Sequence, residues 1–221
     1  RSGPVFKNQW GNYNADLEFK NVAFNFHNSS ATIRKVSGNA NISDEKILLQ
    51  KLVGNWGKSP FQIEGAINRL THKNSSFDLT IDSSKLTPAN LPQTPFFKKI
   101  NLTGNLGIRS KLKGTFDDFQ FITELNLDST GYKFSTFKKI PGDTNSISME
   151  GRLNTANFVE FKTFRYKIQD AIMRGSGKLN LFDSQDFIFN LFGENISLKS
   201  IASNFSPLEA MESGVANISL K

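Results

Sequence analysis

Several residue types that support catalysis, metal binding or covalent cross-linking are scarce or absent in this sequence. It contains no cysteine, and only two histidines, two tryptophans and three tyrosines. Without cysteine there is no disulfide, no thiol nucleophile and no cysteine-ligated zinc site. No stretch approaches the ~18 apolar residues of a membrane-spanning helix, and no charged-then-apolar leader opens the chain. The mean hydropathy of -0.36 predicts a soluble chain.

The few residues that could carry chemistry lack the partners that chemistry requires. His27 follows a strand-like run and His72 stands in a polar turn, and neither has a triad partner or metal ligand at a recognisable spacing. Asp117 and Asp118 are adjacent, so on an extended chain their carboxylates point apart, and turn capping explains them better than acid–base catalysis. No glycine-rich phosphate loop is present. We therefore expect no enzyme, no catalytic or metal site and no cofactor.

Phenylalanine and positive charge are in excess. The chain has 21 phenylalanines among 221 residues and a formal net charge of +7. Phenylalanine offers a large apolar area without a polar group, which indicates more apolar surface than a compact core needs, although a low-GC genome also enriches it. The positive charge predicts a solvated face or attraction to anionic headgroups or an acidic partner. Nucleic acid is not expected as a partner, since no binding motif accompanies the basic pairs, which are Lys98-Lys99, Lys111/Lys113, Lys138-Lys139 and Arg165/Lys167.

Alternation of apolar and polar residues is the dominant pattern, and it predicts β-strands. Phe77-Asp78-Leu79-Thr80-Ile81-Asp82 alternates without a break, which sends one set of side chains to each face of a strand. Short polar turns separate the runs, as in an antiparallel meander. Helices are expected to be few and short, at 87–91, 197–205 and 207–211. Similar alternating runs cover 15–20, 22–27, 61–70, 119–128, 158–168, 178–182 and 187–192.

The chain also repeats itself, which predicts a single domain, 1–221, built from units at about 38–104 and 151–214. Each unit has the order strand, strand, turn, strand, strand, short helical turn, then a strand opened by glycine. Five landmarks recur in order at offsets of 110 to 113 residues, and a repeat of this kind extends along one axis. The matched pairs begin at Gly38 and Gly151, Glu64 and Ser176, Phe77 and Phe187, Lys85 and Ser197, and Gly104 and Gly214.

Two segments resemble the AsmA/TamB-like bacterial envelope proteins. Lys113-Gly114-Thr115-Phe116-Asp117-Asp118-Phe119-Gln120 is similar to a G-[ST]-x-D-D-P-x signature that recurs between strands in that family, with Phe119 where proline is usual. The run from Asp82 to Leu91 resembles the AsmA-like C-terminal region, where a strand ends in a short leucine-containing turn. Residues 197–202 echo it in the second unit.

The resemblance, which spans roughly residues 30–221, implies a fold, a location and partners. The expected fold is all-β, an elongated and curled antiparallel sheet of the β-groove or β-taco type with a few short helices. The family is similar to bridge-like lipid transfer proteins, whose groove carries acyl chains between membranes. The implied setting is the periplasm, within an inner-membrane-anchored protein whose anchor lies outside this sequence. We read Arg1-Ser2-Gly3-Pro4 as a junction and the chain as a piece of a longer one.

The functional expectation is a non-enzymatic lipid-transfer module whose apolar strand faces shelter phospholipid or other acyl chains between inner and outer membrane. Basic residues at the groove rim are expected to hold phosphate headgroups. A closed β scaffold of the cell envelope, which binds other envelope proteins, is the alternative, and a carbohydrate-binding or adhesin domain is disfavoured by the scarcity of tryptophan and tyrosine. The candidate groove-lining residues are Leu17, Phe19, Phe24, Phe26, Phe61, Ile63, Phe77, Leu79, Ile81, Phe119, Phe121, Leu125, Leu127, Phe187, Phe189 and Leu191.

Overall fold

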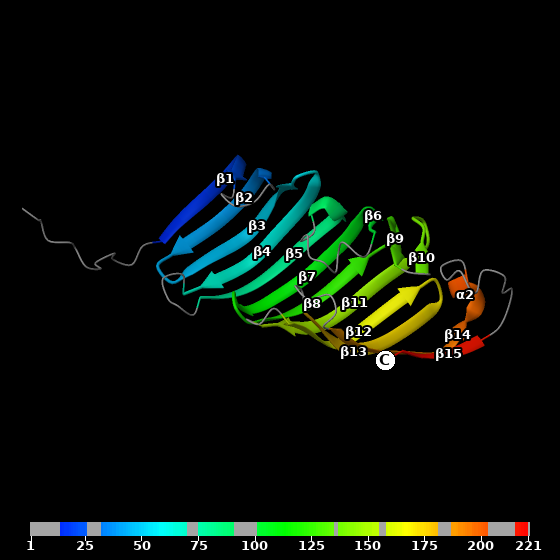
Figure 1. Ribbon diagram of the computed structural model, residues 1–221. Helices are drawn as coiled ribbons and strands as arrows, with labels where there is room; N and C mark the ends of the chain where they lie inside the picture. Colours follow the sequence, from blue (N-terminus) through cyan, green and yellow to red (C-terminus); the bar gives the residue numbers. More distant parts are fainter. Residues whose placement is uncertain are drawn as a thin grey trace, which may run out of the picture.

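The fold is dominated by one long antiparallel sheet. In the computed structural model this sheet has twelve strands, and a small sheet of three strands lies beside it. The structure describes residues 14–25, 32–69, 75–90, 101–134, 137–154, 158–180, 187–202 and 215–220. Figure 1 shows the strands of the long sheet following one another in chain order. The all-β prediction is confirmed.

The strands of the long sheet form a meander in which every neighbour is antiparallel and no connection crosses the sheet. Each strand pairs with the next because the alternating runs are joined by short turns, which return the chain directly to its neighbour. The strands are β1 (Asn14–Asn25), β2 (Thr32–Ser43), β3 (Lys46–Trp56), β4 (Ser59–Asn68), β5 (Ser76–Leu86), β7 (Leu106–Thr115), β8 (Phe119–Asn126), β11 (Asn145–Leu153), β12 (Phe158–Ile168), β13 (Ala171–Asn180), β14 (Phe187–Ser197) and β15 (Val215–Leu220).

The remaining elements all belong to connections at one edge of the long sheet. The 3₁₀ turn η1 (Pro88–Asn90) and β6 (Thr103–Gly104) lie between β5 and β7 in the chain. Strands β9 (Thr130–Phe134) and β10 (Phe137–Lys139) lie between β8 and β11, and helix α2 (Leu198–Ala202) follows β14. Because antiparallel strands reverse at each turn, the ends of β5, β8 and β14 share an edge. The predicted helix at 207–211 falls outside the described residues.

The pairing registers divide the long sheet into two equivalent sets of six strands. Leu86 pairs with Leu106, and Ile196 pairs with Ala216, so both partners are 110 residues apart in the two halves. Gly65 pairs with Leu79, and Gly177 with Phe189, in the same way. The equivalent series are β1-β2-β3-β4-β5-β7 and β8-β11-β12-β13-β14-β15.

The irregularities of the ladder also recur in the two halves. The register shifts between Leu49 and Leu52 in β3 and, at an offset of 112 residues, between Phe161 and Phe164 in β12. A β-bulge of this kind bends its strand and increases the local twist, and bulges at matched places give both halves the same local geometry. The registers equate Gly151 with Ala40 rather than with Gly38, because Gly151 pairs with Phe161 as Ala40 pairs with Leu49.

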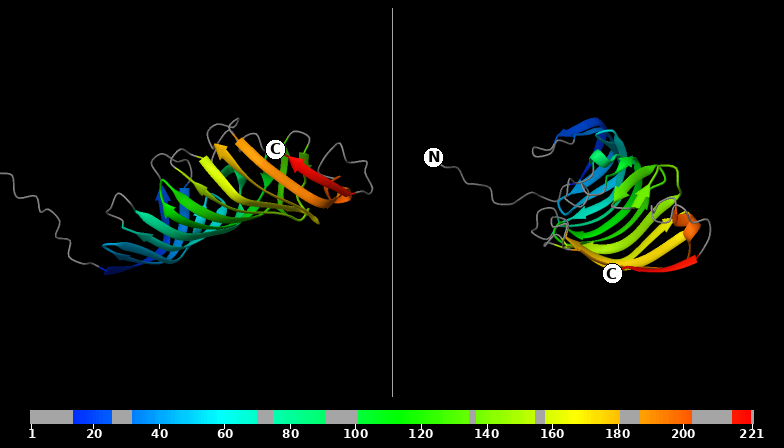
Figure 2. Two further views of the ribbon diagram at one scale, coloured as in Figure 1. Left: turned by 90° about the horizontal axis from the view of Figure 1, so that it is seen from below. Right: turned by 45° about the vertical axis from the view of Figure 1, so that its right-hand side comes forward.

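The long sheet is open. Within the described residues β1 pairs only with β2, and β15 only with β14, so the twelve strands do not close into a barrel. The sheet twists and bends along its length (Figure 2). Contacts between elements run mainly between hydrogen-bonded neighbours, which means that no second sheet packs across the long one in the part of the chain that the structure describes.

Candidate functional site: the apolar face of the sheet

Register separates the residues of the long sheet into an apolar face and a polar face, because directly paired residues lie on the same face. From β3 to β8, for example, Leu49, Gly65, Leu79, Leu112 and Phe121 are paired in one continuous row. The neighbouring positions in the same strands carry mostly charged and polar side chains. The sheet is therefore amphipathic over its whole width.

The candidate groove-lining residues stand on this apolar face. Phe26 lies outside the described residues, and Phe187 is placed only by its backbone pairing with Leu179. Leu17 and Phe24, in β1, are exposed, at 39% and 40% of their surface. Phe77, Phe121 and Leu127 are buried. The remaining candidates are half-buried: Phe19, Phe61, Ile63, Leu79, Ile81, Phe119, Leu125, Phe189 and Leu191.

Phenylalanine rings from separate strands meet on the apolar face. The ring centroids of Phe121 and Phe161 are 6.0 Å apart, and those of Phe161 and Phe189 are 5.5 Å apart. Phe164 meets Phe189 edge to face at 5.0 Å. These distances are typical of aromatic pairs that stabilise by about 0.5–1.5 kcal/mol beyond the area they bury. The four rings form a continuous aromatic surface over β8, β12 and β14, which we call the Phe cluster.

Glycines in the intervening strands make room for these rings. Gly151 of β11 is paired with Phe121 and Phe161, and Gly177 of β13 is paired with Phe161 and Phe189. A Cβ atom on Gly151 would stand 2.7 Å from Cζ of Phe121, and one on Gly177 would stand 2.6 Å from Cδ2 of Phe189. The rings consequently lie over the glycine backbone, which marks these glycines as sites of close approach.

Sequence reasoning missed two members of the Phe cluster. Phe161 and Phe164 are three residues apart, so strict alternation assigns them to opposite faces. The register shift between them returns both to the apolar face. The spacing of Leu49 and Leu52, which repeats this irregularity in the first unit, was the signal that could have identified it.

One edge of the apolar face is covered by the chain itself. Leu86, Leu106 and Leu127 form a buried cluster against which Leu125 and Tyr132 pack. A second cluster contains Tyr166, Ile168, Ala171 and Ile196, with Leu198 of α2 packed against it. Leu127 and Leu125 thus belong to a covered core at this edge, where the connections that carry β9 and α2 lie over the sheet.

A buried polar group joins the two covered clusters. Nδ2 of Asn145 donates to the hydroxyl oxygens of Tyr132, at 3.1 Å, and Tyr166, at 2.9 Å, and the two hydroxyls also bond each other. The backbone N–H of Asn145 donates to Oδ1 of Asp128 at 2.7 Å. Burial raises the pKa of both tyrosines above the ordinary 10.0. This network fixes β9 against β11 and β12.

Lys139 is buried rather than solvated, which corrects the expectation for the Lys138-Lys139 pair. Its side chain is 2% exposed, and Nζ donates to the carbonyl oxygens of Thr130 at 2.7 Å, Ile140 at 3.0 Å and Asp128 at 3.2 Å. Burial lowers the pKa of Lys139. Lys138, the adjacent residue, is exposed. The buried ammonium group holds the β9–β10 hairpin to the turn that follows β8.

The opposite face carries cross-strand ion pairs. Asp82 in β5 pairs with Arg109 in β7 at 3.2 Å, and Asp78 pairs with Lys113 at 3.3 Å. Glu160 and Lys178 repeat the arrangement between β12 and β13 at 3.4 Å. Exposed pairs of this kind contribute little to stability, but opposite charges placed directly across a ladder favour the observed register. This face is a solvated surface.

Some large apolar residues are exposed on the polar face, and each is paired with a basic residue. Ile122 is 55% exposed and Ile188 is 66% exposed. Their register partners are Lys111 and Lys178, whose aliphatic stems can lie over an apolar neighbour. Such residues stand singly among charges, so they form no continuous apolar surface.

The basic pairs of the sequence are not arranged along the apolar face. Lys111, Lys113, Arg165 and Lys167 are all paired with polar-face positions. Lys98 and Lys99 lie outside the described residues. The expectation that these pairs border the apolar surface and hold headgroups there is therefore wrong for the four residues that the structure places, because strand alternation turns them to the other side of the sheet.

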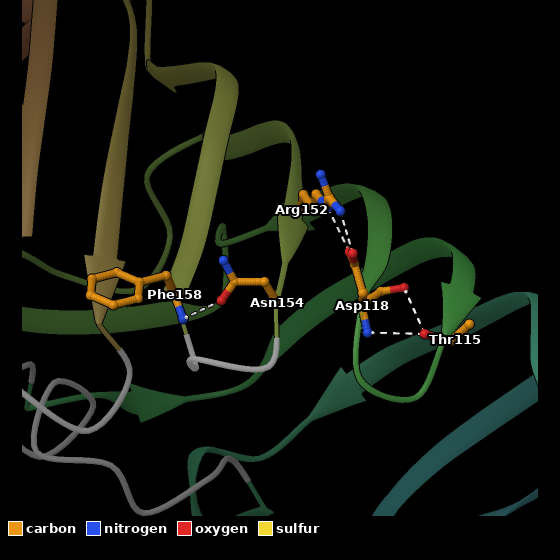
Figure 3. A network of polar contacts seen from close by, with 5 residues as sticks. All are labelled: Thr115, Asp118, Arg152, Asn154 and Phe158. Carbon is orange, nitrogen blue, oxygen red and sulfur yellow. Dashed lines mark hydrogen bonds and ion pairs between the residues drawn. The ribbon is translucent and has the colours of Figure 1, made fainter. Parts of the chain in front are cut away.

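The Asp117-Asp118 turn is structural (Figure 3). The backbone N–H of Asp118 donates to Oγ1 of Thr115 at 3.2 Å, which closes the turn between β7 and β8. The carboxylate of Asp118 bonds and pairs with the guanidinium group of Arg152 on β11. The hydrogen bond from Arg152 lowers the pKa of Asp118. In the next turn at this edge, Oδ1 of Asn154 accepts from the backbone N–H of Phe158 at 3.3 Å.

The described residues contain no cluster of histidine, cysteine, aspartate or glutamate that could hold a metal ion. His27 and His72 lie outside them. No helix among the described residues has the length and apolar character needed to cross a membrane. Comparisons with known protein families, curated proteins and solved structures find no match for this chain.

Proposed function

We propose that the apolar face binds the acyl chains of phospholipids or related lipids and that the protein has no enzymatic activity. The observation that carries this proposal is the single-layer sheet with an apolar face of half-buried phenylalanine, leucine and isoleucine. An apolar sheet face must meet something apolar. Across the described residues no protein layer supplies that contact beyond the covered edge, and an acyl chain supplies it.

In this proposal the sheet curls around its apolar face to form a trough. The bend of the sheet in Figure 2 and the glycines beneath the Phe cluster support such a curl, because small residues relieve crowding on the inner side of a curved sheet. The elements β9 and α2 then border the trough along the covered edge. The Phe cluster forms part of its floor.

The energetics of acyl-chain burial are adequate for binding without polar contacts. Each methylene group moved from water contributes ~0.8 kcal/mol, so a chain of about 16 carbons contributes on the order of 12 kcal/mol. Association costs ~4–15 kcal/mol in lost freedom. A long saturated chain therefore binds usefully, whereas a chain of about eight carbons gains only about half as much and binds poorly.

The polar groups on the apolar face are paired with one another, which favours recognition of the chain over the headgroup. The hydroxyls of Ser110 and Thr123, both buried, lie 2.7 Å apart in a hydrogen bond. Ser83 donates to the carbonyl oxygen of Pro60 at 2.5 Å. Because these groups already have partners, they add little to headgroup recognition. We therefore expect discrimination among lipids by acyl-chain length.

The resemblance to AsmA/TamB-like proteins gives this proposal a setting. A module of this family would act in the periplasm, as part of an inner-membrane-anchored protein, and pass lipid toward the outer membrane. The turn at Thr115–Asp118 and the two six-strand units support the resemblance. Envelope proteins that deliver or receive the lipid would be its partners.

Adjacent residues of β14 provide a matched test of the acyl-chain site. Phe189 belongs to the apolar face and contacts Phe161 and Phe164, whereas Ile188 belongs to the polar face and is 66% exposed. We expect Phe189→Glu to reduce binding of a fluorescent 16-carbon fatty acid at least tenfold, since a carboxylate is poorly compatible with an apolar ligand. Ile188→Glu should bind like the parent protein.

Circular dichroism decides between an open face and a closed scaffold in the same pair of variants. Under the proposal Phe189→Glu remains folded, because the charge reaches water in the absence of lipid. If the apolar face is a sealed core, the same substitution leaves a buried charge and unfolds the protein. Unfolding of Phe189→Glu together with no lipid in the parent protein, measured by native mass spectrometry, would support the scaffold instead.

A further inference from the structure

β1 presents an open edge that is twelve residues long. In the part of the chain that the structure describes, its only partner is β2, so its other side offers unpaired backbone N–H and C=O groups. Exposed edges of this kind are templates for strand addition, and proteins usually shorten or cover them. The inference concerns what this edge accepts.

The second half of the sheet shows what the equivalent edge accepts. Leu17 pairs with Ala40 in β2 as Phe121 pairs with Gly151 in β11, and Val22 pairs with Val36 as Leu125 pairs with Ile147. β1 is therefore the counterpart of β8. The side of β8 that corresponds to the open side of β1 is occupied by β7, in an antiparallel ladder from Gly107 to Gly114.

The polar-face side chains of β7 are basic. Arg109, Lys111 and Lys113 are exposed and alternate with Ile108, Ser110 and Leu112. In the ladder, Lys111 faces Ile122 and Lys113 faces Gln120, so β8 offers these two lysines no charge. The strand that fits this type of edge thus alternates basic and apolar residues.

β1 places carboxylates where β8 has neutral residues. Glu18 pairs with Asn39 as Ile122 pairs with Glu150, and Asp16 pairs with Asn41 as Gln120 pairs with Arg152. A strand with the sequence of β7 on β1 would consequently set one lysine against Glu18 and another against Asp16. Opposite charges directly across a ladder are favourable.

The two carboxylates are accessible to such a partner. Both residues are exposed, and the side chain of Glu18 retains 61% of its surface while it pairs with Lys20 at 2.9 Å. Asp16 accepts a hydrogen bond from Nδ2 of Asn41 at 2.9 Å, on the side toward β2. Their apolar-face neighbours Leu17 and Phe19 remain available to aliphatic residues of an added strand.

We infer that β1 binds an extended segment of another polypeptide, one that alternates lysine or arginine with aliphatic residues, by antiparallel strand addition. Backbone hydrogen bonds would supply the affinity, and Asp16 and Glu18 would select a basic strand in the correct register. The inference is independent of the lipid proposal, since it uses the edge of the sheet and the polar face.

A peptide with the sequence of residues 106–115, Leu-Gly-Ile-Arg-Ser-Lys-Leu-Lys-Gly-Thr, is the probe. Fluorescence anisotropy of the labelled peptide should show saturable binding to the 221-residue protein. Replacing both of its lysines by glutamate should weaken binding about tenfold, because two attractive contacts become repulsive. No binding of the unmodified peptide at millimolar protein would overturn the inference.

Charge variants of the protein locate the site. Asp16→Lys together with Glu18→Lys should weaken peptide binding about tenfold and restore binding of the glutamate-substituted peptide. Glu64→Lys together with Glu150→Lys makes the same change of charge at exposed polar-face positions away from β1 and should leave binding unchanged. Equal loss in both double variants would show that only net charge matters and would overturn the inference.

The absence of native cysteine permits a direct test of register. Glu18→Cys should cross-link to a peptide that carries cysteine in place of its first lysine, the counterpart of Lys111. Lys46→Cys, at an exposed position of β3, is the matched control and should not cross-link. Equal cross-linking at both positions, or dimers of the protein joined through β1 in place of the peptide adduct, would contradict the assignment.

Discussion

At the scale of single residues, glycine controls how closely the phenylalanine rings approach the sheet. Gly151 and Gly177 are each paired on both sides with phenylalanine. A side chain at either position would occupy space that a ring now fills, so the ring would have to rise away from the backbone. The apolar face owes its flat aromatic surface to these two positions.

The first prediction concerns Gly177. In Gly177→Ala the added Cβ would stand 2.5 Å from the carbonyl oxygen of Ile188 and 2.6 Å from Phe189, so we expect the free energy of unfolding in urea to fall by about 1–3 kcal/mol. Gly107→Ala is the control, since its nearest contact would be Cβ of Asn126 at 3.3 Å. A loss at Gly107 equal to that at Gly177 would contradict the explanation from ring packing.

A second residue-scale prediction concerns the buried tyrosine pair. Tyr166→Phe removes the hydroxyl that receives the Nδ2 bond of Asn145 at 2.9 Å, and we expect a loss of about 1–3 kcal/mol in unfolding free energy. It leaves the amide of Asn145 with fewer partners in a buried site. Thermal and urea unfolding of the two proteins provide the measurement, and an unchanged stability would show that the network is dispensable.

The same tyrosines predict instability in alkali. Burial raises the pKa of Tyr132 and Tyr166 in the folded protein, while the unfolded chain loses these protons near the ordinary pKa of 10.0. Above pH 10 the unfolded state therefore binds fewer protons than the folded state, and stability falls as pH rises. The fall should be shallower in Tyr166→Phe. Appearance of phenolate absorbance from all three tyrosines near pH 10 in the folded protein would contradict this.

At the scale of elements, one buried ammonium group determines the position of the β9–β10 hairpin. Lys139→Met removes the donor that Nζ supplies to the carbonyl oxygens of Asp128, Thr130 and Ile140. Because each buried carbonyl left without a partner costs about 1–3 kcal/mol, we expect a loss of at least 2 kcal/mol and faster amide exchange in β9. Lys138→Met, at the exposed neighbour, should change neither quantity.

The elements that sequence predicts best are those with uninterrupted alternation. The run from Phe77 to Asp82 lies in β5 as expected, and the short turns at 87–91 and 197–205 contain η1 and α2. Where a bulge breaks the alternation, the prediction fails locally. The runs 15–20 and 22–27 were read as separate, whereas Asn21, with φ of 55°, is a kink within the single strand β1.

Other elements could not be predicted because their stabilising contacts are distant in sequence. Nothing in the local sequence of residues 130–139 distinguishes β9 and β10 from a loop. Lys139 was read as solvated because lysine is rarely buried, and only the carbonyl oxygens gathered around it by the hairpin make burial tolerable. The candidate apolar face was predictable from alternation, whereas its covered edge depends on contacts between separate connections.

At the scale of the whole molecule, the sheet has two different surfaces and little interior. The polar face is stabilised by exposed ion pairs such as Asp82–Arg109, and the apolar face is covered only along the edge that carries β9 and α2. Since most contacts join neighbouring strands, stability is expected to be approximately a sum of local terms, as in repeat proteins. The acyl-chain proposal explains why the rest of the apolar face lacks a protein cover.

Photo-crosslinking with a 16-carbon fatty acid that carries a diazirine near its methyl end tests the acyl-chain proposal most directly. We predict that mass spectrometry finds the label on apolar-face residues such as Phe61, Leu79 and Phe189, and not on Ile122 or Phe192, which are more exposed to solvent. An excess of unlabelled fatty acid should abolish labelling. Labelling that follows solvent exposure, with Ile122 and Phe192 modified and the apolar face unmodified, would contradict the account.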